Sequence, residues 1–559
     1  MTYRHFKYEG WLYGLAFLLA LGLRLIQLGA IPLNDAEAAP ALQALQIAQG
    51  SRPALAPHPL YIVSTSILFF LYGGGTNFLA RLIPALIGSL LVFVPRLFED
   101  RLKPRPGLLL AFFIALDPGL TALSRQAASP ILAIAFLFAA WACISKNKMQ
   151  HAGFFAAIAL LSGPSIWPGL LGLGITWAIL QGLNSRRPAQ TKVEHSNFDV
   201  KAALPAFTIT FVTAGTLFFI VPNGLSAVLA SISAFINAWL IPSDVSAGRL
   251  FLSLLVYQPL ALLLALIAIL RGLVRGSPRI IPLSIWLLVS LLLAVFLPSR
   301  HVSDLAWTLI PLCALAALEF ARSFTIFPEE RSEVIGVALL TAFIWTFAWL
   351  DFAGMVWLPS DSQQYLVRLW LLIGALVMLL LSILLVAAGW SVRTARIGGV
   401  WGMALVLGLL GFGGTLGAAG LRGSANPELW RSPSIPAQAE LLQKTVWDIS
   451  GYGLGHKTAA SVVIVGLDSP ALEWALRGHD VSVVGSLNIS SSPHLVITPF
   501  QMDSVLEAAY RGQDFGWREN PLWSPALPND WRRWVVLRQM PQAGETIILW
   551  VRDDLFLDR

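Results

Sequence analysis

The sequence predicts an α-helical polytopic membrane protein with about thirteen transmembrane helices and a C-terminal extracytoplasmic α/β domain. Of its 559 residues, 56% are hydrophobic and only 12% are charged, whereas about 25% of the residues in a soluble globular protein are charged. The mean hydropathy of +0.69 agrees with a membrane protein. Long apolar runs recur up to residue 421, and the composition then becomes polar. We therefore expect a transmembrane domain over 1–421 and a soluble domain over 422–559.

The apolar runs set the number of spans, because a helix that crosses a bilayer needs roughly 17–25 mostly apolar residues. Runs of this kind predict spans near 11–30, 80–97, 107–123, 129–144, 152–168, 169–184, 203–221, 249–270, 280–297, 304–321, 334–350, 365–389 and 398–420. The first run lacks a convincing cleavage site, so we expect a retained span rather than a signal peptide. Segments 59–74 and 223–244 are expected to be interfacial helices on the outer side, although 223–244 also suits a poorly hydrophobic span.

Basic residues predict the orientation of these spans. With the N-terminus in the cytoplasm, the predicted cytoplasmic loops hold 19 of the 38 Lys and Arg residues, as the positive-inside rule requires. Counting 59–74 as a full span would invert every later loop and reverse this bias. We therefore expect a multi-pass protein with a cytoplasmic N-terminus and an extracytoplasmic C-terminal domain.

The segment after residue 421 predicts strands that alternate with short helices. Strands are expected at 461–467, 481–487 and 494–500, and helices at 469–479 and near 501–510. This alternation is typical of an α/β domain with parallel pairing. Two later apolar runs, 534–540 and 546–553, are expected to form a closing hairpin.

Composition also excludes some kinds of partner and cofactor. The net charge is +7, but no basic cluster is interleaved with aromatic residues, so the sequence gives no support for a nucleic-acid partner. The two cysteines, Cys143 and Cys313, lie in apolar runs. They support neither a disulfide framework nor a cysteine metal site.

Two carboxylates stand where the first span should leave the membrane on the outer side. Asp35 and Glu37 follow the run that ends near Leu28. Acids at this place also suit the start of a helix, where the helix dipole stabilises them by about 0.3–1 kcal/mol, and Pro40 suits a first helical turn. From the residues alone, a structural and a chemical role both remain open.

Several segments around this pair resemble a known class of enzymes. The first span ends in "LRLIQLGAIPL", "PHPLY" precedes a short apolar helix, and "FLARLIPALIG" and "LSRQAASP" follow. A later element reads "PSRHVSDLAWTLIPLCALAALEF". Together they resemble the GT-C class of polytopic membrane glycosyltransferases, specifically bacterial relatives of protein O-mannosyltransferases and lipid A aminoarabinose transferases. The resemblance covers residues 10–145 well and 295–320 fairly.

The resemblance implies a glycosyltransferase of the bacterial plasma (inner) membrane. It would transfer a sugar from a polyprenyl-phosphate donor to a hydroxyl of a lipid, glycan or protein acceptor on the outer side, with inversion at the anomeric carbon. Such a reaction needs a carboxylate to take the proton of the acceptor hydroxyl. It also needs positive charge to hold the leaving phosphate.

The resemblance also implies roles for individual residues. Asp35 is the expected general base and Glu37 its helper. The expected donor-phosphate ligands are Arg125, Arg300, Arg81 and His58, and the further candidates are Asp117, His301 and Asp304. A divalent metal is left open, with Asp35, Glu37 and His58 as its candidate ligands. Each residue also has an ordinary role open to it: a snorkelling arginine at a span edge, a solvated histidine, or a salt bridge of Arg300 with Asp304.

A non-catalytic alternative stays open beside the enzyme. In this alternative the chain is a membrane scaffold or a glycan-polymer handling protein that retains the fold. Ala36 separates Asp35 from Glu37, whereas the acids of the resembling enzymes are adjacent. Gln126 and Ser129 stand where those enzymes often carry another acid. Both departures favour the scaffold.

Overall fold

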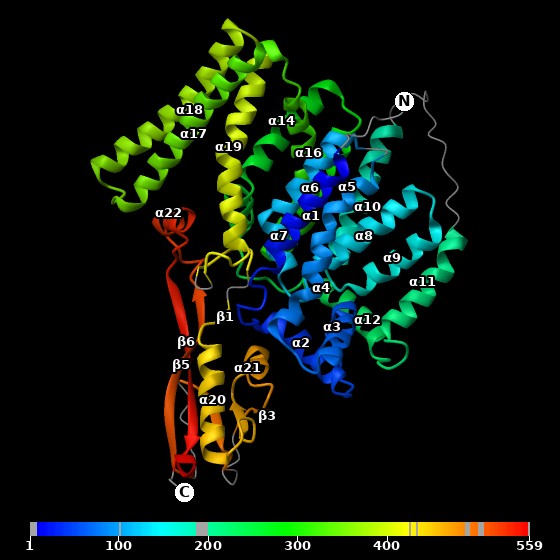
Figure 1. Cartoon of the computed structure of the whole chain (residues 1–559), viewed down its shortest axis with the longest axis vertical. Coiled ribbons are helices and arrows are strands. Elements are labelled where there is room, and N and C mark those ends of the chain that lie inside the picture. The colour runs from blue at the N-terminus through cyan, green and yellow to red at the C-terminus, as the bar shows by residue number, and fades with distance from the viewer. Residues whose placement is uncertain are drawn as a thin grey trace.

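The computed structural model describes residues 8–99, 102–185, 200–423, 426–431, 434–486, 492–500 and 508–556. A bundle of helices fills the upper part of the molecule, and a sheet domain lies at its lower end (Figure 1). The bundle consists of α1 (Glu9–Leu25), α2 (Asp35–Ala48), α3 (Pro59–Tyr72), α4 (Asn77–Leu90), α5 (Val94–Leu97), α6 (Pro104–Leu116), α7 (Pro118–Ser124), α8 (Ile131–Ser145), α9 (Met149–Leu161), α10 (Ile166–Ser185), α11 (Val200–Gly215), α12 (Gly224–Asn237), α13 (Ala247–Tyr257), α14 (Pro259–Arg275), α15 (Ile280–Phe296), α16 (Ala306–Phe320), α17 (Arg331–Gly354), α18 (Gln363–Gly389) and α19 (Val392–Ala418).

The helices agree with the predicted membrane class but differ in length from the predicted spans. Among the described residues, six helices are long and apolar enough to cross a membrane, or up to eight if each of two bent pairs is one span. The other five predicted spans, 11–30, 129–144, 152–168, 203–221 and 280–297, form helices of 13 to 17 residues. At 1.5 Å per residue these are shorter than a hydrocarbon core of about 30 Å. For these five helices, a full crossing stays a prediction.

Two predicted spans are broken in the structure. The span expected at 107–123 forms α6 and α7, which meet at 57°, and the span expected at 249–270 forms α13 and α14, which meet at 97°. Each second helix begins with a proline, Pro118 or Pro259. Proline has no N–H to donate and keeps the residue before it out of the helical conformation. Asp117 and Gln258 therefore lie at breaks inside the bundle.

The sheet domain is a six-stranded mixed sheet with the order β1-β5-β6-β4-β2-β3. Its elements are β1 (Ile435–Pro436), α20 (Ala439–Leu454), β2 (Ser461–Val465), α21 (Pro470–Ala475), β3 (Asp480–Val484), β4 (Leu495–Pro499), β5 (Tyr510–Pro521), α22 (Pro528–Leu537) and β6 (Gln542–Arg552). The expected parallel pairing is present, because β2 pairs in parallel with both β3 and β4. Most of the helix expected near 501–510 lies outside the described residues, and β5 begins at its last residue.

The predicted closing hairpin is wrong in its first strand. Residues 534–537 belong to α22, and β6 pairs with β5 and β4 instead. Pro528 stands in the first turn of α22, where proline suits a helix, and Asp530 accepts a hydrogen bond from the backbone N–H of Leu527. The Trp534 indole donates to the carbonyl of Pro427 at 2.7 Å. The helix places Trp534 against this carbonyl, although the composition of the segment suits a strand.

The sheet domain is anchored on one end of the bundle. The ring of Trp474 in α21 packs on Phe69 of α3 with centroids 5.9 Å apart. The Trp474 indole donates to Asn77 at the start of α4, at 2.8 Å, and the Arg477 side chain donates to the carbonyl of Gly75 at 2.9 Å. Figure 1 shows α2 and α3 at this lower end of the bundle, next to α21. The α2 helix, with its two acids, therefore lies between the bundle and the sheet.

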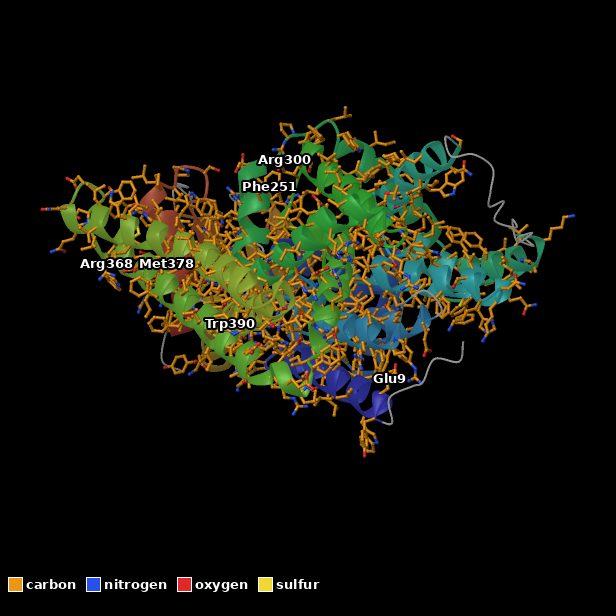
Figure 2. All side chains as sticks on the ribbon, turned by 90° about the horizontal axis from the view of Figure 1, so that it is seen from above. Glu9, Phe251, Arg300, Arg368, Met378 and Trp390 are labelled. Atoms are coloured by element: carbon orange, nitrogen blue, oxygen red, sulfur yellow. The ribbon has the colours of Figure 1, made fainter. Side chains whose placement is uncertain are left out.

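The α17–α18 hairpin leaves most of its apolar surface uncovered. Ala375 is the one buried residue of α18. Seen from above, the hairpin projects sideways from the bundle, with Arg368 and Met378 on the projecting part (Figure 2). Arg368 reaches Asp351 of α17 at 3.5 Å. A helix that is apolar on all sides needs apolar surroundings. The chain is accordingly a multi-pass membrane protein.

The predicted orientation can be tested with a topology reporter. A phosphatase that folds only outside the cytoplasm, fused after Trp430, is expected to be active, because the charge bias places the end of α19 outside. A fusion in the predicted cytoplasmic loop at 271–279 is the control and should be inactive. The opposite pattern would overturn the orientation.

Candidate functional site

Glu37 lies in a closed network of hydrogen bonds and is 4% exposed. Its two carboxylate oxygens form a bidentate ion pair with Arg81, at 2.9 Å to Nε and 2.6 Å to Nη2. The backbone N–H of Ala127 donates to Oε1 at 2.9 Å, and the Asn34 amide donates to Oε2 at 2.9 Å. Asn34 and Glu37 also form the capping box of α2. The structure therefore gives Glu37 a structural contact at each oxygen.

Arg81 extends this network to the segment between α1 and α2. Its guanidinium donates to the carbonyls of Leu28, Ile31 and Pro32 at 3.3, 2.6 and 3.0 Å. A guanidinium has five N–H donors, and this one distributes them between the Glu37 carboxylate and three carbonyls. The Glu37–Arg81 pair thus holds the turn that carries Asp35.

Arg125 and Arg24 bind carbonyl groups at helix ends. Arg125 donates through Nη1 to the carbonyls of Leu23, Arg24 and Ile26 at 2.8 to 3.0 Å. Arg24 donates to the carbonyls of Ile114 and Ala115, both at 3.2 Å, at the end of α6. The last carbonyls of a helix have no partner within it, and a cation there also suits the helix dipole. In this structure Arg125 caps α1, while its role as a phosphate ligand stays a prediction.

Asp35 connects the bundle to the sheet domain. Its Oδ1 accepts hydrogen bonds from the Ser469 hydroxyl at 2.7 Å and the Ala471 N–H at 3.1 Å. Its Oδ2 forms an ion pair with Arg518 of β5 at 2.6 Å. The Asp35 side chain is 25% exposed, so it keeps access to solvent. If Asp35 takes a proton from the hydroxyl of the acceptor substrate, it must exchange one of these contacts for a contact with that hydroxyl.

Asp117 lies at the break between α6 and α7. It is buried, and Oδ1 accepts from the N–H of Leu120 at 2.8 Å as the N-cap of α7. Its Oδ2 faces the Gln258 amide at 3.5 Å, so the breaks of the two bent pairs meet. Asp117 is therefore in the interior of the bundle, apart from Asp35.

Arg300, His301 and Asp304 do not form the expected oriented cluster. The Arg300 side chain donates to the carbonyl of Leu297 at 3.1 Å, and it lies at the edge of the bundle (Figure 2). Asp304 accepts from the backbone N–H of His301 at 2.7 Å and caps the start of the α16 segment. Within the part of the chain that the structure describes, no ion pair joins Arg300 to Asp304.

His58 begins α3 beside Gly163. Burial lowers the pKa of His58 to about 4, so the imidazole is neutral at pH 7. Its buried Nδ1 has no hydrogen-bond partner among the described residues. In the same described ranges, no three His, Cys, Asp or Glu side chains are grouped to hold a metal ion. Asp35, Glu37 and His58 thus do not fit a shared metal site, and we assign no step to a metal.

A polar cavity opens between the bundle and the sheet domain, close to the acidic pair. Its volume is about 470 Å³, and its walls include Pro32, Glu428, Arg431, Gln438 and Glu519. A smaller cavity of about 40 Å³ shares Pro32, Arg431 and Ile435 with it. This inner part is lined by Asn34, Glu37, Arg81, Arg125, Gln126 and Arg431 among others. The two cavities therefore bring three arginines to one place at the end of the bundle.

Sequence reasoning missed Tyr257 and the residues that the linker over 422–436 contributes to the site. Arg431 donates to the carbonyl of Gly417 at 2.7 Å and leaves Nη1 buried without a partner among the described residues. The Tyr257 hydroxyl, at the break of α13 and α14, donates to Glu428. The segment 422–436 is rich in Pro and Ser, a composition that predicts only an extended linker. Charged residues in a polar linker carry no signal of burial, so "PELWR" offered no sign of this role.

The fold, a helical bundle that carries a sheet domain at one end, is GT-C-like. It is similar to ArnT from Cupriavidus metallidurans bound to undecaprenyl phosphate, with a TM-score of 0.55 and 14% identity over 98% of this chain and 99% of that chain. The apo state of that protein gives a TM-score of 0.50 and 15% identity over 88% and 93%. No protein-family model and no curated protein matches the sequence. The similarity confirms the GT-C-like fold predicted from the sequence.

Proposed function

We propose that the protein is a glycosyltransferase that moves a sugar from a polyprenyl-phosphate donor to an acceptor hydroxyl at the outer face of a bacterial plasma membrane. The observation that carries this proposal is the polar cavity, where Arg431 presents a free, buried N–H at the end of a membrane bundle. A buried guanidinium with an unused donor attracts an anion. A lipid phosphate at the membrane surface is such an anion.

A second, apolar cavity supports a lipid as the carrier of that phosphate. It has a volume of about 210 Å³ and is lined by side chains of α6, α14, α16 and α19, including Phe112, Phe320 and Phe412. It also touches Tyr257, whose hydroxyl reaches Glu428 in the wall of the polar cavity. An apolar groove next to a cationic pocket suits a molecule with an apolar chain and a phosphate head. The fold neighbour bound to undecaprenyl phosphate is consistent with such a ligand.

For the reaction we propose Asp35 as the general base, with Arg431, Arg125 and Arg81 as the positive charge near the leaving phosphate. The Asp35 carboxylate would take the proton of the acceptor hydroxyl as its oxygen bonds to the anomeric carbon. The bond from that carbon to the phosphate oxygen breaks, and the phosphate leaves with the electron pair. Glu37 would act through Arg81 and through the turn that carries Asp35, which makes it a positioning residue.

The scaffold alternative is favoured by one specific observation. Asp35 and Glu37 both have their charge paired, with Arg518 and Arg81, so neither carboxylate is free in the structure. A scaffold that only holds a lipid-linked glycan would bind the lipid and transfer nothing. Purified protein in lipid nanodiscs, supplied with polyprenyl-phosphate sugars and membrane acceptors, separates the two. Binding without transfer supports the scaffold, and absence of both contradicts both proposals.

Arg431→Gln is expected to weaken the binding of undecaprenyl phosphate by about tenfold or more, because hydrogen bonds to charged groups contribute about 1.5–3 kcal/mol. Native mass spectrometry of nanodisc-embedded protein measures the bound fraction. Arg511→Gln is the control, since Arg511 pairs with Asp553 in the sheet domain at 2.5 Å, away from the cavity. Equal binding by both variants would remove Arg431 from the site.

A further inference from the structure

Two charged side chains in one wall of the polar cavity, Glu428 and Arg431, each have a buried polar atom without a partner. Among the described residues, Glu428 Oε1 and Arg431 Nη1 are buried and make no hydrogen bond. Most buried polar atoms in folded proteins have a partner. Two exceptions in one cavity wall indicate a polar ligand that supplies the missing partners.

Glu428 is the central acid of this wall. It is 4% exposed, and the Tyr257 hydroxyl donates to its Oε2. Arg538 lies at 3.5 Å from Oε1, at the outer limit of a direct contact. The Arg538 guanidinium is instead stacked 4.9 Å from the centre of the Tyr257 ring and 4.7 Å from that of Trp534. Oε2 of Glu428 is therefore well bound, whereas Oε1 has a long ion-pair contact with Arg538 and no hydrogen bond.

The chemistry of the free atoms identifies the kind of group that fits. A carboxylate oxygen accepts a hydrogen bond, while a guanidinium nitrogen donates one. A group that carries both hydroxyl donors and oxygen acceptors satisfies both atoms. The polar head of a lipid-linked sugar has both, in its sugar hydroxyls and its phosphate.

We infer that Glu428 contacts the substrate, accepting a hydrogen bond from a hydroxyl of the polar head of the lipid-linked donor. The inference rests on the proposed function for the identity of that donor. Neither a motif nor the acidic pair at the first span points to this residue. It adds to the site an acid that, unlike Asp35 and Glu37, lines the large cavity itself.

The surroundings of Glu428 shift its pKa, so the protonation of this carboxyl group distinguishes it from an ordinary glutamate. Burial raises its pKa above the ordinary value, and Arg538, the Tyr257 hydroxyl, Arg431 and Arg422 oppose that rise. Because the folded pKa is raised, the protonated carboxyl persists to a higher pH than that of an ordinary glutamate and is lost as the pH increases. A carbodiimide that reacts with protonated carboxyls in apolar surroundings can therefore modify it.

The test labels the full-length protein in nanodiscs with dicyclohexylcarbodiimide and locates modified residues by peptide mass spectrometry. Labelling of Glu428 is expected, with a decrease as the pH rises. Saturating undecaprenyl phosphate or undecaprenyl-phosphate glucose should protect Glu428. Stronger protection by the glucosyl lipid identifies a sugar hydroxyl as the contact and supports the inference. Equal protection would mean that the prenyl phosphate common to both lipids covers Glu428 without a sugar hydroxyl, and it would overturn the contact.

Glu473 of α21 is the internal control. Burial also raises its pKa, with Asp468 as a second cause, but it lies outside the cavity. Its labelling should not change with either lipid. An unlabelled Glu428, protection by neither lipid, or equal protection of Glu473 would overturn the inference.

Activity gives an independent measurement that separates this inference from the proposed function. Glu428→Gln keeps the shape of the side chain and an oxygen that accepts from the Tyr257 hydroxyl. It is expected to lower kcat/KM by about 10- to 100-fold, which corresponds to the loss of a hydrogen bond to a charged group. Glu473→Gln should stay close to the wild type. Protection of Glu428 in a protein without transfer would contradict the proposed activity alone. Transfer without protection would contradict this inference alone.

Discussion

Asp35→Asn is expected to lower the rate of sugar transfer by about 10²- to 10⁴-fold, the typical contribution of general acid–base catalysis. Asn keeps an oxygen in the place of Oδ1, so the Ser469 hydroxyl and the Ala471 N–H retain their acceptor. The substitution removes the negative charge, the proton acceptor and the ion pair with Arg518. Initial rates with a polyprenyl-phosphate sugar, at equal amounts of protein in nanodiscs, measure the effect.

The partner of Asp35 provides the control for this prediction. Arg518→Gln breaks the same 2.6 Å ion pair from the side of the sheet domain and leaves the carboxylate in place. If Asp35 is the base, Asp35→Asn should be far slower than Arg518→Gln. If Asp35 only joins the two parts of the molecule, the two variants should transfer sugar at the same rate. That second result would move the chemistry away from Asp35.

Glu37→Ala is expected to destabilise the protein by about 3–5 kcal/mol, because it leaves Arg81 as a buried charge without its counter-ion. Arg81 is 5% exposed and would retain only carbonyl partners. The turn between α1 and α2 would lose its bidentate anchor as well. Thermal unfolding in detergent, followed by the loss of helical circular dichroism, measures the change.

The double variant Glu37→Ala/Arg81→Ala tests the physical cause of this loss. Removing both charges leaves no unpaired charge in the interior. The double variant should therefore lose less stability than the sum of the losses of the two single variants. Glu519→Ala is the surface control, since that carboxylate is in the sheet domain and belongs to no ion pair among the described residues. A loss below about 1 kcal/mol for Glu37→Ala would fall in the range of an exposed pair and would contradict the buried network.

The bent spans and the last helix of the sheet domain show where sequence reasoning stopped. Hydropathy predicts an apolar run over 249–270, but it cannot predict the 97° angle that Pro259 introduces. Composition predicts a strand at 534–540, yet Trp534 binds the carbonyl of Pro427 from a helix. In both cases a packing partner far along the chain, or a backbone break, outweighed the local preference.

The sequence by itself determined the membrane class, most of the helices, the parallel strands β2, β3 and β4, and the place of Asp35 and Glu37 beside the first span. These features depend on apolar length and residue pattern, which are local properties of the chain. Only the tertiary structure decided which charges meet. Asp35 pairs with Arg518, 483 residues away, and Glu428 joins Tyr257, 171 residues away. A charge buried in a protein needs a counter-charge or hydrogen bonds, and folding, not sequence neighbourhood, supplies them.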